Sequence, residues 1–482
     1  MNISLLVLSC LPIMEVIRNN KGGEKLCYNG YMYTKKSTSA TTKRWECSRR
    51  SALRCNGKIT TNLSVSDIIS SIEHNHERDE GSVEAAKMHT TLYHEAKSTR
   101  GNTTGIVAES LESMTQEGRL AMGNLNTVKR YVQRKRQEGR PKEPESLSDL
   151  EIAGEWTMTR GENPVPFLLH DNGAEARNRI IIFATKDALH HLAKSDDWYM
   201  DGTFSSAPAL FEQLFVIRSP LGDSAVSCVY GFLSGKSQEI YQEFFMTILE
   251  KGEELGLDMN PVTTMSDFEK SLLNAIENVF GRHIRTKTCF YHLTQNTWRK
   301  VQSLGLSNVY KEDESTRHFC GMIDRLAFLP ADKIIDGMNF LKLNCPTHLE
   351  PLLEYFDSIY VTGTKRRSRQ IPPLFSPEKW SVYETTVSGE ARTNNLCETW
   401  NNSFKYLVGY SHPTIWAAIE ALNKDAVLVK TSLEKNAIGE PLRKKQKRET
   451  VKLQSRLQRL CLDFSNGTKD IEEFLNGVPK II

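Results

Sequence analysis

The sequence predicts an α+β protein of several domains, in which a small β-rich module and a helical stretch precede a mixed α/β core. Three observations carry this prediction. The chain has 482 residues, which exceeds the usual size of one domain. Short alternating runs typical of strands fill residues 15–80, and helical periodicity follows in residues 81–140. From residue 199 the pattern is strand, strand, strand, helix, strand, helix, strand, which is typical of a mixed sheet covered by helices.

The composition is that of a folded chain in a reducing compartment. Hydrophobic residues make up 39% of the chain and charged residues 25%, which excludes a disordered polypeptide. The net charge is only +3, so any contact with nucleic acid must come from local basic clusters. Ten cysteines are too few for a disulfide scaffold, and several lie near histidines. This usage favours thiolates that are available to bind metal.

Residues 3–13 form an apolar run of the length found in signal peptides. No basic segment precedes the run, and no small-residue cleavage site follows it before the folded-looking stretch begins. We therefore expect no secretion. No stretch reaches the roughly 20 apolar residues that a membrane span requires, so we expect no membrane partner.

Residues 14–80 carry the pattern of a small metal-binding module. Asn29-Gly30 between two β-prone runs predicts a hairpin. The spacing Cys47-x7-Cys55-x18-His74-x-His76 supplies two thiolates and two imidazoles, a full tetrahedral set for zinc. A β-rich module of this size has little apolar core, so we expect structural zinc to stabilise it. The alternative is that these four residues are unrelated surface side chains.

This stretch resembles a FLYWCH-type zinc finger, because Tyr28, Tyr31 and Trp45 stand in family order beside the two cysteines and the His-x-His pair. The first aromatic of the family motif is less clear here. The resemblance implies DNA binding, although such fingers also bind proteins. Basic residues around the finger suit contact with phosphates. They are Lys35, Lys36, Lys43, Arg44, Arg49, Arg50 and Arg54.

Residues 81–148 are predicted as a helical region that ends in a linker. Helical patterns occupy residues 83–93, 103–111 and 124–136, and the third begins with an Asn124 cap and has a strongly basic exposed face. Successive short helices that end in a basic one fit a helix-turn-helix whose last helix lies in the major groove of double-stranded DNA. The alternative is an ordinary solvated face.

Three carboxylates stand at positions where an α/β core could bring them together. Asp201 and Asp267 each follow a hydrophobic or β-prone run, and the strand order places them on the first and fourth strands of the core. Glu398 opens a helical pattern that could pack onto the same sheet. Three converging carboxylates are what two magnesium ions need for in-line attack on a phosphodiester. The alternative is that they are solvated or capping carboxylates.

The carboxylates lie within an ordered set of motifs. These are Asp201-Gly202-Thr203-Phe204, residues 211–217, 235–241 and 266–269, and Cys289-Phe290-Tyr291-His292-Leu293. Together they closely resemble the transposase domain of Mutator-like elements (MULE), from about Asp197 to about Trp416. The resemblance implies a ribonuclease-H-like core in which Asp201, Asp267 and Glu398 are the D-D-E ligands of magnesium or manganese. Relatives often carry His three residues after the Glu, where this chain has Asn401.

The pair Cys289-x-x-His292 matches the C-x-x-H motif that such transposases carry between the second Asp and the Glu. One alternative is zinc shared with a second pair, Cys345-x-x-His348, because a closed zinc site needs four ligands. The other is that Cys289 is buried while His292 lies beside the carboxylates and contacts a scissile phosphate. Near Glu398, Arg392 could also neutralise a phosphate.

The core is expected in two parts. Residues 149–292 form its first part, residues 293–390 an all-helical insertion, residues 391–430 its completion with the Glu398 helix, and residues 431–482 a basic and helical tail. In the tail, the run Arg443-Lys444-Lys445-Gln446-Lys447-Arg448 predicts a nuclear import signal, with an exposed helix face as the alternative.

The carboxylate pattern and the resemblance together imply a nuclear D-D-E transposase that cuts and joins DNA strands at transposon ends. The alternative is a domesticated, catalytically inactive protein, derived from a transposase, that binds DNA or regulates transcription. The intact D-D-E set favours the enzyme. The sequence leaves the oligomeric state open, with a homo-oligomer among the alternatives.

Overall fold

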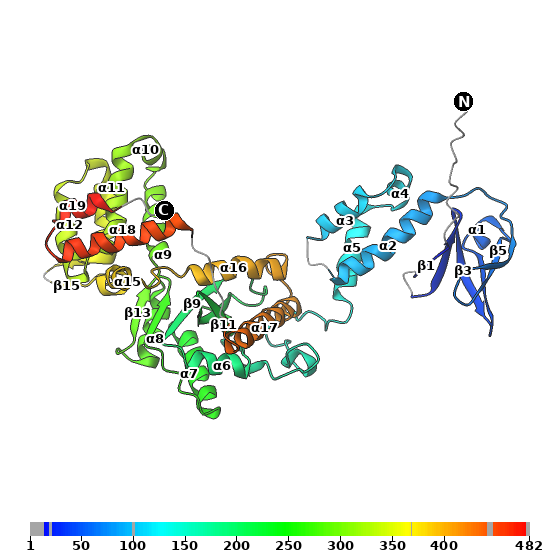
Figure 1. The fold of residues 1–482 in the computed structure, drawn as a ribbon, viewed down its shortest axis with the longest axis horizontal. Helices are drawn as coiled ribbons and strands as arrows, with labels where there is room; N and C mark the ends of the chain where they lie inside the picture. Colours follow the sequence, from blue (N-terminus) through cyan, green and yellow to red (C-terminus); the bar gives the residue numbers. More distant parts are fainter. Residues whose placement is uncertain (1–13, 19–21, 99–101, 368, 441–446, 479–482) are drawn as a thin grey trace. The chain divides into compact units, whose positions relative to one another are not determined.

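The computed structural model describes residues 14–18, 22–98, 102–367, 369–440 and 447–478 (Figure 1). The chain divides into two compact units, Met1–Pro141 and Lys142–Ile482, and each is considered by itself. The apolar run at residues 3–13 lies outside the described residues, as do the first four residues of the basic run at 443–448. Within the described part, no helix is both long and apolar enough for a membrane span.

The first unit begins with a six-stranded antiparallel sheet whose strands follow sequence order. They are β1 (Glu15–Arg18), β2 (Glu24–Tyr28), β3 (Tyr31–Thr38), β4 (Thr42–Cys47), β5 (Lys58–Asn62) and β6 (Ile68–Ile72). The predicted hairpin joins β2 to β3, and both Asn29 (φ 49°) and Gly30 (φ 75°) take the positive φ that a type I′ turn requires. The small core centres on Trp45, whose indole N–H donates to Thr61 Oγ1 at 3.0 Å.

Four helices complete the first unit. They are α2 (Glu80–Ser98), α3 (Thr103–Glu112), α4 (Gln116–Ala121) and α5 (Leu125–Gln137). The sequence patterns predicted α2, α3 and α5 but not the short α4. Asn124 caps α5 as predicted, because its side chain accepts the backbone N–H of Asn126. Leu92, Ile106 and Val132 lie at the centre of the apolar cluster that joins these helices.

The second unit is organised around a seven-stranded sheet in the order β13-β12-β9-β10-β11-β8-β7. The strands are β7 (Leu168–Asp171), β8 (Ile180–Phe183), β9 (Asp197–Thr203), β10 (Gln213–Leu221), β11 (Ser224–Leu233), β12 (Thr263–Ser266) and β13 (Arg285–Thr288). From β9 to β7 the pairing is antiparallel, whereas β12 and β13 are added in parallel beside β9. Residues 180–184, which the pattern left open between strand and helix, contribute the strand β8.

Helices cover both faces of this sheet. They are α6 (Lys186–Ala193), α7 (Gln238–Glu254), α8 (Lys270–Phe280), α16 (Asn395–Val408) and α17 (Ile415–Ala437). Alternate residues of β8 face the two helical layers. Ile180 and Ile182 pack with α6, α7 and α8. Ile181 and Phe183 pack with α16 and α17. A strand buried on both faces reads as a continuous apolar run, which explains the ambiguity of this stretch in the sequence.

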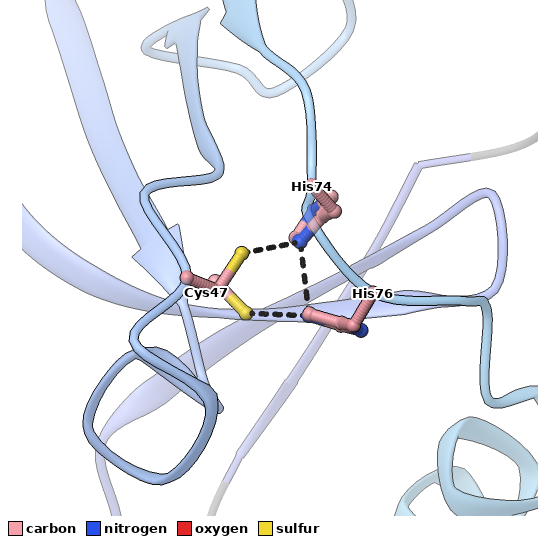
Figure 2. A group of neighbouring side chains, drawn as sticks. Cys47, His74 and His76 are labelled. Atoms are coloured by element: carbon pink, nitrogen blue, oxygen red, sulfur yellow. Dashed lines mark hydrogen bonds between the residues drawn. The ribbon is translucent and has the colours of Figure 1, made fainter.

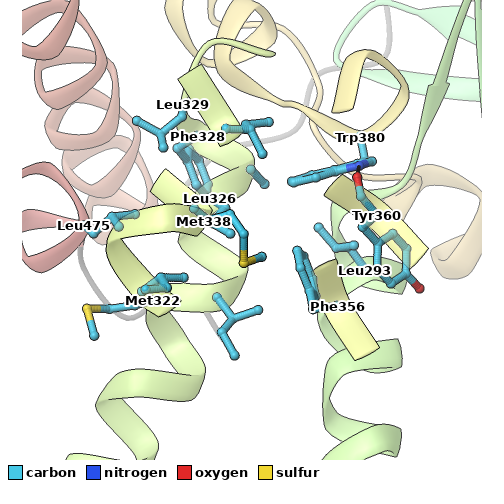
Figure 3. Close-up of a cluster of buried hydrophobic side chains, with 14 of the residues drawn as sticks. Leu293, Met322, Leu326, Phe328, Leu329, Met338, Phe356, Tyr360, Trp380 and Leu475 are labelled. Carbon is cyan, nitrogen blue, oxygen red and sulfur yellow. Dashed lines mark hydrogen bonds between the residues drawn. The ribbon is translucent and has the colours of Figure 1, made fainter. Parts of the chain in front are cut away.

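A helical region separates β13 from α16. Its helices are α9 (Phe290–Ser303), α10 (Ser307–Glu312), α11 (Glu314–Arg325), α12 (Ile334–Leu343), α13 (Glu350–Phe356), α14 (Pro377–Trp380) and α15 (Tyr383–Ser388). The region also contains a small two-stranded hairpin of β14 (Thr364–Arg366) and β15 (Arg369–Ile371). Figure 3 shows the apolar core of the region around Phe328, Phe356 and Trp380.

The C-terminal helices belong to the same core. Leu457 and Leu460 of α18 (Arg448–Ser465) and Leu475 of α19 (Ile471–Gly477) are buried in it. Leu475 lies beside the α11–α12 side chains in Figure 3. Residues 448–478 therefore pack with the helical region and do not extend from it.

Asp324, in α11, places a carboxylate inside this helical core. Its Oδ1 is buried without a hydrogen-bond partner among the described residues. Burial raises the pKa of Asp324 to about 7, although a hydrogen bond from Thr297 and the charge of Arg325 oppose the shift. An Asp in an unfolded chain titrates near pH ~3.9. The folded state therefore binds this proton more tightly, and the resulting stability is fully present below about pH 3.9 and lost as the pH rises through 7.

We expect Asp324→Asn to raise the melting temperature at pH 8 and to flatten its dependence on pH between 5 and 8. The gain in unfolding free energy at pH 8 is at most about 4 kcal/mol, since one pKa unit corresponds to ~1.36 kcal/mol. Thermal denaturation followed by circular dichroism measures both quantities. Asp336→Asn in α12 is the control, because Asp336 is exposed and pairs only with Lys333 among the described residues. Equal shifts in both variants would contradict the assignment.

Candidate functional site

The structure brings the four predicted finger ligands together. Cys47 is the last residue of β4, and Cys55 follows the short α1 (Arg50–Leu53). His74 and His76 come directly after β6. The ligand atoms of the four side chains all lie within 4.8 Å of one another. In Figure 2 the side chains of Cys47, His74 and His76 point toward a common centre.

The separations between these atoms match a tetrahedral metal site. Cys47 Sγ lies 3.3 Å from His76 Nε2, and Cys55 Sγ lies 3.3 Å from His74 Nδ1. The two nitrogens, His74 Nδ1 and His76 Nε2, are 3.2 Å apart. A tetrahedron with zinc–sulfur bonds of ~2.3 Å and zinc–nitrogen bonds of ~2.0 Å requires separations of roughly 3.3–3.6 Å.

Hydrogen bonds outside the cluster orient both imidazoles. His76 Nδ1 lies 2.8 Å from the Glu77 carbonyl oxygen, which can only accept, so His76 Nε2 carries a lone pair that faces the cluster. His74 Nε2 is 2.9 Å from the Tyr33 hydroxyl, which leaves His74 Nδ1 as the atom facing the thiols. Such partners fix ring orientation in metal sites.

The surroundings leave little room for His74 to move. Tyr31 stacks on its ring with centroids 3.8 Å apart. A Cβ added to Gly57 would lie 2.6 Å from His74 Nδ1, so only glycine fits at that position. The backbone N–H of Gly57 also donates to Cys55 Sγ at 3.3 Å, and that of Arg49 donates to Cys47 Sγ at 3.3 Å. Burial raises the pKa of the Cys47 thiol, and the hydrogen bond from Arg49 opposes that shift.

Much of the basic charge around the finger is already neutralised. Lys36 and Arg50 pair with Glu46, Lys35 pairs with Glu24, and Arg49 pairs with Asp79. Of the seven basic side chains that the sequence offered for phosphate contact, these four therefore have carboxylate partners. The remaining three, Lys43, Arg44 and Arg54, form no ion pair within the described residues.

In the second unit, Asp201 lies near the end of β9 and is only 7% exposed. Its Oδ1 accepts the N–H of Gly202 at 3.0 Å, and its Oδ2 accepts the side-chain amide of Asn401 at 2.6 Å. Burial, together with the charge of Asp267, raises the pKa of Asp201 to about 7. Such a carboxylate is costly to hold in its charged form unless a cation lies beside it.

Asp267 follows the last residue of β12. In the parallel pairing of β12 with β9, Thr263 lies opposite Asp197 and Met265 opposite Tyr199. Continued by two residues, this register puts Asp267 next to Asp201, on strands about 4.8 Å apart. Burial raises the pKa of Asp267 as well, against the charge of Lys236.

Glu398 stands in the first turn of α16 and faces the same region. Its charge adds to that of Asp267 in raising the pKa of Asp201. Glu398 Oε1 lies 3.7 Å from His292 Nε2, which is longer than a hydrogen bond. Together with Cys289, these two residues form a group whose ligand atoms lie within 4.8 Å of one another, and Asp201 and Asp267 are not members of that group.

Asn394 ties the Glu398 helix to the sheet. It is fully buried at the N-cap of α16, its side-chain amide donates to the Met200 carbonyl at 2.8 Å, and its backbone N–H donates to Cys289 Sγ at 3.1 Å. Arg218 of β10 donates to the Leu396 carbonyl in the same turn. Cys289 is thus buried and occupied as an acceptor, while His292 lies beside Glu398.

Several polar atoms around the carboxylates are buried without a hydrogen-bond partner among the described residues. They are Glu398 Oε1, Asn401 Oδ1, Asn394 Oδ1 and His292 Nδ1. Buried acceptors of this kind are uncommon and call for an explanation, such as an ion that they would contact. Oxygen atoms predominate among them, and oxygen is the ligand that magnesium prefers.

Two residues near the carboxylates had no assigned role in the sequence. Lys236, between β11 and α7, lies close enough to Asp267 to oppose its pKa shift, and its Nζ stands 3.6 Å from the ring centroid of Phe204. Asn401 was noted only as a departure from the family pattern, yet it is the side chain that contacts Asp201. Its position three residues after Glu398, one helical turn away, was the available signal.

Other residues singled out in the sequence lie apart from the carboxylates. His348 Nε2 is 2.9 Å from Thr316 Oγ1, and Cys345 and His348 form no metal-ligating group with Cys289 and His292 among the described residues. Arg392 packs on the ring of Phe328, with its guanidinium carbon 5.4 Å from the centroid. The structure therefore provides no support for shared zinc.

Two stretches of the chain match models of known protein families. Residues 16–76 match the family model of the FLYWCH zinc finger domain, and residues 198–296 match that of the MULE transposase domain. The second match includes Asp201, Asp267, Cys289 and His292 and ends before Glu398. None of the curated proteins matches this chain. The chain thus carries a FLYWCH zinc finger domain followed by a MULE transposase domain.

Proposed function

We propose that this chain is a D-D-E transposase, a polynucleotidyl transferase that cuts and joins DNA strands by magnesium-dependent in-line phosphoryl transfer. The observation that carries the proposal is the placement of Asp201, Asp267 and Glu398. They come from distant parts of the chain, and the charges of both Asp267 and Glu398 act on the buried Asp201. A fold gains nothing from gathering like charges unless a cation offsets their repulsion.

The sheet supports a ribonuclease-H-like core. Three antiparallel strands, β9, β10 and β11, are extended beside β9 by the parallel strands β12 and β13. Asp201 lies on the central strand β9, and Asp267 follows its parallel neighbour β12. The strands β7 and β8 precede β9 in sequence and lie at the opposite edge of the sheet, beyond β11. They therefore do not alter the pairing of β9 with β12 and β10.

The donor set fits magnesium or manganese better than zinc. Carboxylate and amide oxygens surround the position, and magnesium favours oxygen ligands. Asp201, Asp267 and Glu398 would hold the ions, and Asn401 would orient Asp201. Two bound magnesium ions would activate the attacking oxygen and stabilise the leaving oxygen of the phosphodiester.

The side chains themselves position the reacting DNA. Lys236, steadied by Phe204, offers a cation beside Asp267 to a backbone phosphate. His292 stands next to Glu398, where it could donate to a non-bridging phosphate oxygen. In the first step, water attacks the phosphorus at the element end and the 3′-oxygen leaves as a hydroxyl. In the second step, that hydroxyl attacks the phosphorus of a target phosphodiester, so that a new 3′–5′ phosphodiester forms and the 3′-oxygen of the target strand leaves as a hydroxyl.

The finger supplies zinc-dependent binding to double-stranded DNA, and the proposed site of action is the nucleus. The direct test is strand cleavage by the full chain, with magnesium, of DNA that carries the inverted repeats flanking its coding sequence. A 3′-hydroxyl product at the repeat end is expected. Sequence-specific binding without cleavage would instead favour the domesticated DNA-binding protein.

Asn401→Ala is expected to raise the magnesium concentration at which cleavage is half-maximal. Residues that orient metal ligands typically contribute about 10- to 100-fold in metal affinity or activity, and Asn401 donates to Asp201. A magnesium titration of the cleavage rate measures the change. Asn402→Ala is the matched control, because Asn402 is the next residue of α16 and is exposed. An equal effect of both substitutions would argue against an orienting role.

A further inference from the structure

The last helix of the first unit, α5, is strongly basic, and the proposed strand-transfer reaction assigns no role to this charge. The α5 helix carries Lys129, Arg130, Arg134, Lys135 and Arg136 and no acidic residue. In contrast, α2, α3 and α4 each carry glutamates. A helix surface that is only solvated normally mixes both signs, often as pairs one turn apart. The one-sided charge of α5 points to an anionic partner.

Packing fixes which residues of α5 face outward. Val128, Tyr131 and Val132 are buried in the cluster shared with α2 and α3. Lys135 also turns inward, where it pairs with Glu138 and its side chain is only 10% exposed. Apart from Leu125 at its first position, the exposed residues of α5 are Asn126, Thr127, Arg130, Gln133, Arg134 and Gln137. At ~100° per residue they occupy an arc about 120° wide, so they form one stripe along the helix.

The residue types in this stripe are those that read base edges. Arginine donates to guanine O6 and N7, asparagine and glutamine bond adenine N6 and N7, and threonine contacts the thymine methyl group. Charge alone would need only lysine and arginine, so the amides favour contact with bases. Arg130 and Arg134 form no ion pair within the described part of the chain, unlike the four paired cations around the finger.

The connection between α4 and α5 has the length and the glycine that are typical of a helix-turn-helix. Only Met122, Gly123 and Asn124 separate the two helices, and Gly123 takes a positive φ of 77°. A short turn with glycine is typical of the helix-turn-helix. The first helix is held in place, because Thr115 at its N-cap donates its backbone N–H to Glu84 of α2 at 2.9 Å.

We propose that α4 and α5 form a helix-turn-helix, and that the exposed stripe of α5 reads base edges in the major groove of double-stranded DNA. A helix of this length spans about 20 Å, and the major groove, ~12 Å wide, admits it. This surface adds sequence selectivity to the binding supplied by the finger. It goes beyond the proposed strand-transfer function and does not depend on the carboxylates.

The test is selection of bound sequences from a pool of DNA duplexes with a random central segment, using the full zinc-loaded chain without magnesium. The wild-type chain is expected to enrich a sequence motif. Gln133→Ala changes no charge and removes an exposed side chain, so it should relax selectivity at one base pair by roughly tenfold or more. Its affinity for a duplex without the motif should stay unchanged.

Two double variants distinguish contacts with bases from electrostatic attraction to the DNA phosphates. Arg130→Ala with Arg134→Ala should erase part of the motif, whereas Lys87→Ala with Lys97→Ala removes the same charge from α2 and should only weaken all binding. Enrichment of no motif by the wild-type chain overturns the proposal. So does an unchanged motif in the α5 variants, an equal effect of the α2 variants, or tighter binding to RNA of the selected sequence. Because the selection is run without magnesium, it measures DNA binding alone. A failure of cleavage in a separate assay would therefore contradict the proposed function and leave this inference intact.

Discussion

Asp201→Asn is expected to abolish magnesium-dependent cleavage of element-end DNA while DNA binding is retained. The carboxylate oxygens of Asp201 would hold metal, and an amide cannot supply that charge. Metal stabilisation of the transition state contributes several kcal/mol, so the cleavage rate should fall about 10³-fold or more. Gel analysis of a labelled duplex measures cleavage, and fluorescence anisotropy measures binding.

The fold should survive this substitution. Asp201 is buried near Asp267, so replacing it by a neutral side chain of the same shape removes repulsion from the metal-free chain. Asp197→Asn is the matched control, because Asp197 is the first residue of the same strand, four residues from Asp201. Cleavage by the Asp201 variant at the wild-type rate would refute the enzymatic role of this site.

Cys55→Ser is expected to unfold the first sheet and to release its zinc. Cys55 Sγ is completely buried and faces His74, and the core beneath it is small. Zinc binding contributes apparent free energies of about 10–16 kcal/mol in zinc-finger peptides, so the loss of one ligand removes much of the stability of the module. Zinc content per chain and the rate of proteolysis within residues 22–78 measure the effect.

The same substitution at Cys27 is the control. Cys27 is a buried thiol in β2 of the same sheet and belongs to no metal-ligating group among the described residues. The Cys27→Ser chain should keep its zinc. The second unit should melt as in the wild type in both variants, since it has a core of its own. A zinc content of one per chain in the Cys55 variant would contradict the ligand assignment.

The strands and the finger ligands were predictable because their signals are local. The Asn29-Gly30 turn, the alternation around Trp45 and the spacing of the four ligands each reside in a short stretch of chain. The strands from β9 to β13 likewise follow from apolar runs bounded by polar residues. Asp267 could be placed beside Asp201 because the ends of neighbouring parallel strands meet at one edge of a sheet.

The contacts that complete the carboxylate site were beyond sequence patterns. The side chains of Asn401 and Asn394 contact residues that lie 200 and 194 positions away in the chain. No periodicity encodes such a pairing. The short α4 escaped prediction because six residues hold too few apolar positions to show a helical period.

Because the helical region lies between Asp267 and Glu398 in the chain, the folding of the carboxylate site depends on complete synthesis. Glu398 reaches Asp201 only after the chain has passed through the helical region, and the core of that region also needs Leu457, Leu460 and Leu475. A product truncated near residue 440 would contain all three carboxylates but leave this core open to water. Quality-control proteases recognise such exposed apolar surface. A prematurely terminated copy is therefore expected to be degraded, although it carries all three carboxylates.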